Sequence, residues 1–118
     1  MKVAFVGDKP SRLNKDPNVA FVGAKCYPRL LKWLNYMDVE NPTLLNSHTL
    51  ELMVRIIQAE VHGFKIVALG NTASKRLSKA GVKHYKMDHP SGLNRKLNDK
   101  QYELDMLNKC REWLYENS

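Results

Sequence analysis

Short apolar runs alternate with longer amphipathic segments along this chain. Four runs predict strands because they are short, largely apolar and bounded by glycine or polar residues. They are Lys2–Val6, Thr43–Asn46, Lys65–Leu69 and Val82–Met87. The last run also carries charged residues, which favours a position at an edge of the sheet.

Apolar residues at helical spacing follow the first two strands. A helix from about Tyr27 to Met37 would have an apolar face of Leu30, Leu31, Trp33, Leu34 and Met37. A second helix would open at Ser47 or His48, with Ser47 as a possible N-cap. It would run to about Val61 and end before Gly63.

Two further helices are predicted in the second half of the chain. Asn71 or Thr72 would cap a short helix that ends near Gly81, and Asn98 or Asp99 would start the last helix. The apolar side of that last helix would consist of Leu104, Met106, Leu107, Cys110, Trp113 and Leu114.

The alternation of strands and helices predicts an α/β fold, a three-layer sandwich around a four-stranded, mostly parallel sheet. The 118 residues form one domain, residues 1–118. Ligands of such sheets bind outside the carboxyl ends of the strands. Polar loops follow all four strands there, namely Gly7-Asp8-Lys9-Pro10-Ser11, Asn46-Ser47-His48, Gly70-Asn71-Thr72 and Asp88-His89-Pro90-Ser91.

Positive charge is concentrated in one region. The chain has a net charge of +7, and residues 75–100 contain eight Lys or Arg against two Asp. A localised basic patch is typical of a protein that binds the phosphate backbone of nucleic acid. A solvated basic face is the alternative, but the patch surrounds the loop at His89, which favours nucleic acid as the partner.

Several classes of protein are disfavoured. No apolar run reaches the ~18 residues of a membrane span and no signal peptide is visible, so we expect a cytoplasmic protein that does not enter membranes. Cys26 and Cys110 form no CxxC pair and are too few for a four-thiolate metal site, and a structural disulfide is not expected. We therefore expect no metal and no organic cofactor.

Two glycine-containing loops are candidates for binding. Gly7 permits close backbone approach, Pro10 stiffens the loop, and Asp8 could orient a water or bind a base. A simple turn is the alternative. After Gly70, the start of a helix at Asn71 could meet an anion, although a plain helix cap explains the same residues.

His89 is the best single candidate for catalysis. It opens the run His89-Pro90-Ser91-Gly92-Leu93-Asn94-Arg95, in which a stiff turn is followed by a basic tip. An imidazole can donate a hydrogen bond to negative charge that develops on a leaving group. The tip, with Asn94, Arg95 and Lys96, suits a loop that enters a nucleic-acid groove.

Taken in order, these motifs resemble the uracil-DNA glycosylase superfamily over most of the chain. Gly7 to Pro10 resembles its Gly-x-x-Pro loop, and Phe21-Val22-Gly23 resembles the Pro-Phe-Val-Gly stretch of the thermostable iron–sulfur branch. Leu44-Leu45-Asn46 resembles the strand whose terminal Asn contacts the base, and Ala68 to Ala73 resembles a strand–helix junction. The run from His89 to Arg95 resembles the His-Pro-Ser loop and the Asn-Pro-Ser-Gly-Leu-Ser-Arg form of the mismatch-specific branch.

The resemblance implies a glycosylase-like fold and hydrolysis of the N-glycosidic bond of uracil or a related damaged or modified base, as in base-excision DNA repair. The base would be flipped out of single- or double-stranded DNA. His89 and Asp8 would be catalytic, and Phe21, Asn46, Gly7 and Pro10 would bind the base. The resemblance places the DNA contacts at Ser11, Asn71, Thr72, Ser91, Gly92, Asn94, Arg95 and Lys96. We expect a monomer.

Three departures from the family keep other functions open. Lys9 stands where several branches place Asp or Asn to position water, the four cluster cysteines are missing, and the chain is short, as phage-encoded enzymes often are. A catalytically inactive module that binds DNA or protein is one alternative. A small nucleotide-binding enzyme that uses Gly70-Asn71-Thr72 is the other, and tight binding of free nucleotide without DNA affinity would identify it.

Overall fold

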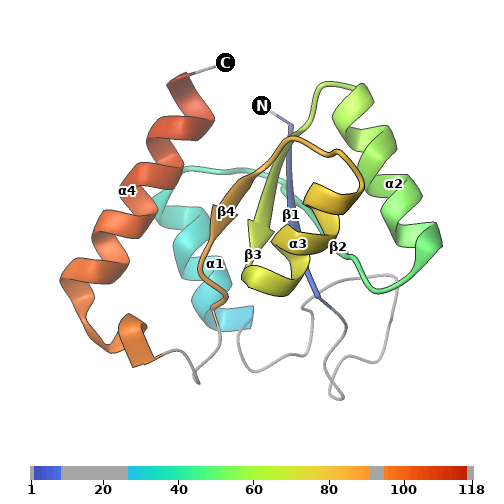
Figure 1. The fold of residues 1–118 in the computed structure, drawn as a ribbon. Coiled ribbons are helices and arrows are strands. Elements are labelled where there is room, and N and C mark those ends of the chain that lie inside the picture. The colour runs from blue at the N-terminus through green and yellow to red at the C-terminus, as the bar shows by residue number, and fades with distance from the viewer. Residues whose placement is uncertain (1, 9–26, 91–94, 117–118) are drawn as a thin grey trace.

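The computed structural model describes residues 2–8, 27–90 and 95–116, and Figure 1 shows their arrangement. The strands are β1 (Val3–Gly7), β2 (Thr43–Asn46), β3 (Lys65–Leu69) and β4 (Tyr85–Met87). The α-helices are α1 (Tyr27–Tyr36), α2 (Leu50–Val61), α3 (Asn71–Lys79) and α4 (Lys100–Glu116). A 3₁₀ helix, η1 (Arg95–Asn98), precedes α4.

The four strands form one sheet in the order β2-β1-β3-β4. Every pair is parallel, so the sheet is all-parallel rather than mostly parallel as the sequence predicted. The edge position of the fourth strand is confirmed, but β4 covers only three residues of the predicted run.

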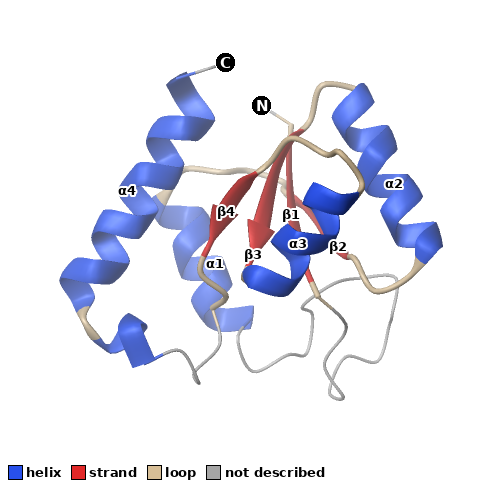
Figure 2. Ribbon diagram, viewed as in Figure 1, coloured by secondary structure: helices blue, strands red, loops and turns tan. Residues whose placement is uncertain are grey.

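Helices cover both faces of the sheet, α1 and α4 on one face and α2 and α3 on the other (Figure 2). All of β1 is buried, and its side chains alternate between the two layers. Val3 and Phe5 belong to the cluster with α1 and α4, whereas Ala4 and Val6 belong to the cluster with α2 and α3. The α/β fold and its layers therefore agree with the sequence prediction.

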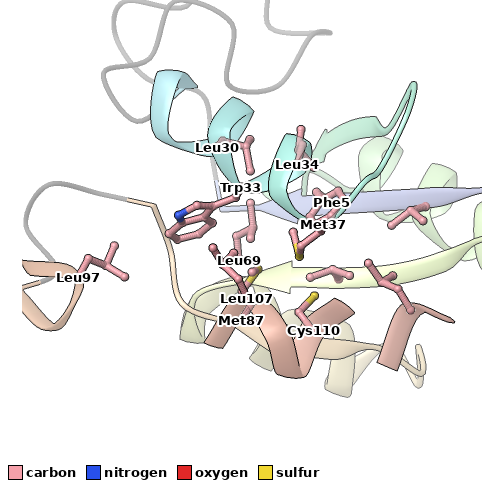
Figure 3. Packing of buried hydrophobic residues seen from close by; sticks show 13 residues of the cluster. Phe5, Leu30, Trp33, Leu34, Met37, Leu69, Met87, Leu97, Leu107 and Cys110 are labelled. Carbon is pink, nitrogen blue, oxygen red and sulfur yellow. The ribbon is translucent and has the colours of Figure 1, made fainter. Parts of the chain in front are cut away.

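The larger of the two cores lies between the sheet, α1 and α4 (Figure 3). Its largest member, Trp33, is 2% exposed, and its indole Nε1 donates a 3.0 Å hydrogen bond to Glu103 on α4. Lys65 at the start of β3 donates to the carbonyls of Trp113 at 3.3 Å and Leu114 at 2.5 Å. These bonds satisfy carbonyls near the end of α4 and fix that helix to the sheet.

Two residues that the sequence placed on the apolar faces of helices are exposed. Leu31 on α1 is 46% exposed and Leu104 on α4 is 38% exposed, although both follow the helical spacing of their buried neighbours. Within the described ranges, no helix is long and apolar enough to cross a membrane.

Two helix starts differ from the sequence prediction, and a third agrees with it. The N-cap of α2 is Thr49, whose side chain accepts a hydrogen bond from the Leu52 amide, so Ser47 is not the cap. The N-cap of α3 is Gly70 rather than Asn71 or Thr72, and both predicted caps lie inside the helix. Asp99 does accept hydrogen bonds from the first amides of α4, as expected.

Adjacent leucines on α1 test the layer assignment. Leu30 is fully buried and Leu31 is 46% exposed. We expect Leu30→Ala to lower the free energy of unfolding by about 2–5 kcal/mol, because it leaves a cavity in the core. Leu31→Ala, the matched control, should change it by only about 0.5 kcal/mol. Urea unfolding of both variants measures this, and equal losses would contradict the packing of α1.

Candidate functional site at the carboxyl ends of the strands

The parallel register brings the ends of β1 and β2 level with each other. Gly7, the last residue of β1, pairs with Asn46, the last residue of β2. Asn46 is only 2% exposed, and within the part of the chain that the structure describes its buried amide Nδ2 has no hydrogen-bond partner. A buried donor of this kind is costly unless something bonds to it. Asn46 is thus a donor available to a ligand at the carboxyl ends of the strands.

Ser47 ties the two strand ends together. Its backbone N–H donates to the carbonyl of Gly7 at 3.0 Å and to that of Asp8 at 3.1 Å. Its hydroxyl also donates to the Gly7 carbonyl, at 2.9 Å. The side chain that sequence analysis assigned to a helix cap therefore holds the backbone beside Asn46 in place.

Asp8 forms an ion pair that the sequence did not predict. Arg76 on α3 donates from Nη1 to Asp8 Oδ1 at 2.5 Å, and the same nitrogen lies 3.3 Å from the Asp8 carbonyl and 3.4 Å from the Ser47 hydroxyl. Both side chains of the pair are more than a third exposed. Arg76 follows the buried Ala73 by three residues and precedes the buried Leu77 on α3. This helical spacing was the signal in the sequence that Arg76 lies close to the sheet.

His89 is half-buried two residues after β4 and lies against Gly70. A Cβ atom added at Gly70 would lie 3.3 Å from the His89 Cβ, a contact tight enough that His89 would have to move by a few tenths of an ångström. Burial lowers the pKa of His89, and the nearby Asp8 carboxylate opposes this to a smaller extent. At neutral pH, His89 is therefore an uncharged imidazole, which can donate a hydrogen bond from one ring nitrogen.

A cavity of about 390 Å³ opens beside His89. Three predicted site residues line it, namely His89, Asn71 and Lys96, together with Lys86, Asp88 and Gly70. Asp8, Asn46, Thr72 and Arg95 are described but do not line this cavity. Its two lysines give it the positive charge that a phosphate group would need.

The side chains of Asp88 and Tyr102 brace the rim of the cavity. Tyr102 on α4 donates a 2.7 Å hydrogen bond to Asp88, and this bond raises the pKa of the tyrosine. The Lys96 ammonium lies 6.0 Å from the centre of the Tyr102 ring. Lys96 and Arg95 begin a 3₁₀ helix, so neither lies in the simple loop that the sequence predicted.

Both ring nitrogens of His84 have hydrogen-bond partners. Nδ1 lies 2.8 Å from the carbonyl of Val82, to which it must donate. Nε2 lies 2.8 Å from the Ser74 hydroxyl. The two contacts hold the ring in place, which gives His84 a structural role.

Six of the predicted site residues lie outside the described residues, and so does Lys9; the six are Pro10, Ser11, Phe21, Ser91, Gly92 and Asn94. Among the residues that are described, no group of three or more His, Cys, Asp or Glu side chains could hold a metal ion. Cys110 is fully buried in the core, where burial raises its pKa to about 12, so it is unsuited to nucleophilic chemistry.

Comparison of the chain with protein-family models, with curated proteins and with solved structures finds no match in any of the three.

The lowered pKa of His89 predicts a pH dependence of stability. Below the ordinary histidine pKa of 6.5, the unfolded chain binds a proton that the folded chain resists. The free energy of unfolding should therefore fall as the pH decreases from 6.5, and His89→Gln should reduce that fall. Urea unfolding across this pH range measures it, with the exposed His62→Gln as control. An unchanged pH dependence in His89→Gln would contradict the prediction.

Glycine substitutions test the contact between Gly70 and His89. Gly70 and Gly81 both have positive φ, +93° and +73°, so alanine should cost about 1 kcal/mol or more of stability at either position. Only Gly70→Ala also meets His89, and only this variant should move the imidazole NMR signals of His89. Gly81→Ala is the matched control, since nothing lies within 4 Å of its added Cβ. Equal costs with unmoved His89 signals would contradict the contact.

Proposed function

We propose that this chain is a DNA glycosylase of the uracil-DNA glycosylase type, which hydrolyses the N-glycosidic bond of uracil or a related damaged or modified base. The observation that carries the proposal is the unsatisfied amide of Asn46, buried at the carboxyl ends of the strands, the side of the sheet on which Asp8 and His89 also lie. The ordered motifs of the sequence support the same function and a fold of the same family.

The role of Asn46 follows from its amide. An amide group offers both a donor and an acceptor in one plane, which complements the imide edge of uracil. The buried Nδ2 gains a partner when a base carbonyl reaches it, so base binding recovers the cost of leaving this donor unpaired. Phe21 would stack on the same base.

His89 would stabilise the departing base. When the bond between the sugar C1′ and the base nitrogen breaks, negative charge spreads to the base carbonyl oxygens. A neutral imidazole donates a hydrogen bond to such an oxygen without first losing a proton, and burial keeps His89 neutral. Water then supplies the oxygen that bonds to C1′.

Asp8 is the described candidate for contacting that water and for stabilising positive charge on the sugar. Arg76 holds Oδ1 of this carboxylate, and Asp8 is close enough to His89 to affect its pKa. One acidic group and one neutral imidazole thus stand near each other, as the two halves of the reaction require.

DNA would be bound through its phosphates. Lys86 and Lys96 line the cavity beside His89. Thr72 and Arg95, each next in the sequence to a residue that lines the cavity, are exposed. Flipping a base out of a duplex costs a few kcal/mol, which phosphate and pocket contacts offset. We further propose that the protein acts in DNA repair as a cytoplasmic monomer, without a metal or organic cofactor.

A binding module that has lost hydrolysis is the second candidate. The Arg76 ion pair favours it, because the guanidinium occupies a carboxylate oxygen of Asp8 that would otherwise contact water. Lys9, in place of the usual water-positioning residue, points the same way. If Lys9→Asp or Lys9→Asn created activity in an inactive parent, the binding module would be the better description of this chain.

Base release from oligonucleotides that carry one uracil tests the first proposal. Alkaline strand cleavage after incubation should reveal release from single- or double-stranded DNA. His89→Ala should slow release about 10²–10³-fold, because it removes a donor to the leaving group, and should leave DNA affinity nearly unchanged. His62→Ala is the control. It removes an exposed imidazole that precedes β3, at the opposite end of the strands from His89.

Two results would count against a glycosylase role for His89. Equal losses of release and DNA affinity in His89→Ala would make His89 a structural residue. DNA binding without release of uracil or of other modified bases would favour the inactive module.

A further inference from the structure

The outer face of α2 exposes a row of large apolar side chains. Leu50, Val54, Ile57 and Val61 are 86%, 51%, 39% and 77% exposed. Their spacing of four, three and four residues places them in one line along the helix. The buried side chains of α2 are Leu52 and Ile56, which lie on another side of the helix from this row.

A groove of about 370 Å³ lies between this row and α3. Its floor is apolar and includes Leu50, Met53, Val54 and Ile57, and its far wall carries Arg76 and Lys79. Leu50 and Val61 are eleven residues apart, so the row is about 16 Å long, or three helical turns. These dimensions match one face of a short helix.

The positive charge of Arg76 and Lys79 favours an acidic partner for the groove. We propose that the groove between α2 and α3 binds an acidic amphipathic helix of a partner protein. The apolar side of that helix would cover the row on α2, and its Asp or Glu side chains would face Arg76 and Lys79. Apolar anchors between charged rims are the usual anatomy of such interfaces.

Two other occupants fit the surface less well. Nucleic acid would place hydrated phosphates on a floor of Leu, Val, Ile and Met side chains. A second copy of this chain would bring another net charge of +7 to the basic wall. The α2 helix of that copy would offer Glu51 and Glu60 together with Arg55, and so little net negative charge.

Synthetic peptides of about four helical turns provide the test. The probe has Leu at positions i, i+3, i+4 and i+7 and Glu on both flanks. One control peptide has the same composition in shuffled order, and another replaces Glu by Lys. NMR titration should show that the acidic peptide binds at least about tenfold more tightly than either control and shifts signals of α2 and α3.

Protein variants locate the binding. Ile57→Glu should weaken the acidic peptide about tenfold, whereas Leu104→Glu should not, although the two side chains are 39% and 38% exposed. Lys79→Glu should reverse the preference toward the Lys peptide. Lys109→Glu on α4 makes the same change of charge outside the groove and should leave the preference as it was.

Three results would overturn the proposal. The first is equal binding of the acidic and shuffled peptides, and the second is acidic-peptide binding that Ile57→Glu leaves intact. The third is evidence that a second copy, or another part of this chain, already covers the groove. A concentration-dependent dimer that Ile57→Glu abolishes would make a second copy the occupant. A lowered melting temperature of Ile57→Glu without peptide binding would mean that the chain covers the groove itself.

Discussion

Parallel pairing of β1 with both β2 and β3 is the constraint on which the rest of this structure depends. Every residue of β1 is buried, and successive side chains serve opposite layers. A shift of register by one residue would exchange those layers and misalign the strand ends. The pairing of Gly7 with Asn46, and of Leu69 with Met87 two residues before His89, is therefore a consequence of core packing.

Polar contacts then fix what the register brings together. Ser47 binds the carbonyl of Gly7, and Arg76 reaches from α3 to both the side chain and the carbonyl of Asp8. The same helix begins at Gly70, against which His89 packs. The ends of β1 and β2 are thus joined to each other, and both Asp8 and His89 are positioned by α3. A binding or catalytic site needs side chains that are held in place in this way.

The sequence predicted the elements well and the tertiary contacts poorly, for physical reasons. Apolar periodicity located the strands and helices because both faces of the sheet must be covered. It could not assign Ser47, because a hydroxyl suited to a cap is used instead on a neighbouring strand. The ion pair of Asp8 with Arg76 joins residues 68 positions apart. The spacing on α3 could place Arg76 beside buried residues, but no local pattern could identify Asp8 as its partner.

Arg76 belongs to two surfaces at once. Its guanidinium pairs with Asp8 at the strand ends, and its side chain also lines the groove beside α2. An acidic group in the groove and the Asp8 carboxylate would therefore compete for the same cation, which links the two surfaces electrostatically. For this reason a change at Arg76 cannot separate their roles, whereas Lys79 lines the groove and His89 lines the cavity at the strand ends.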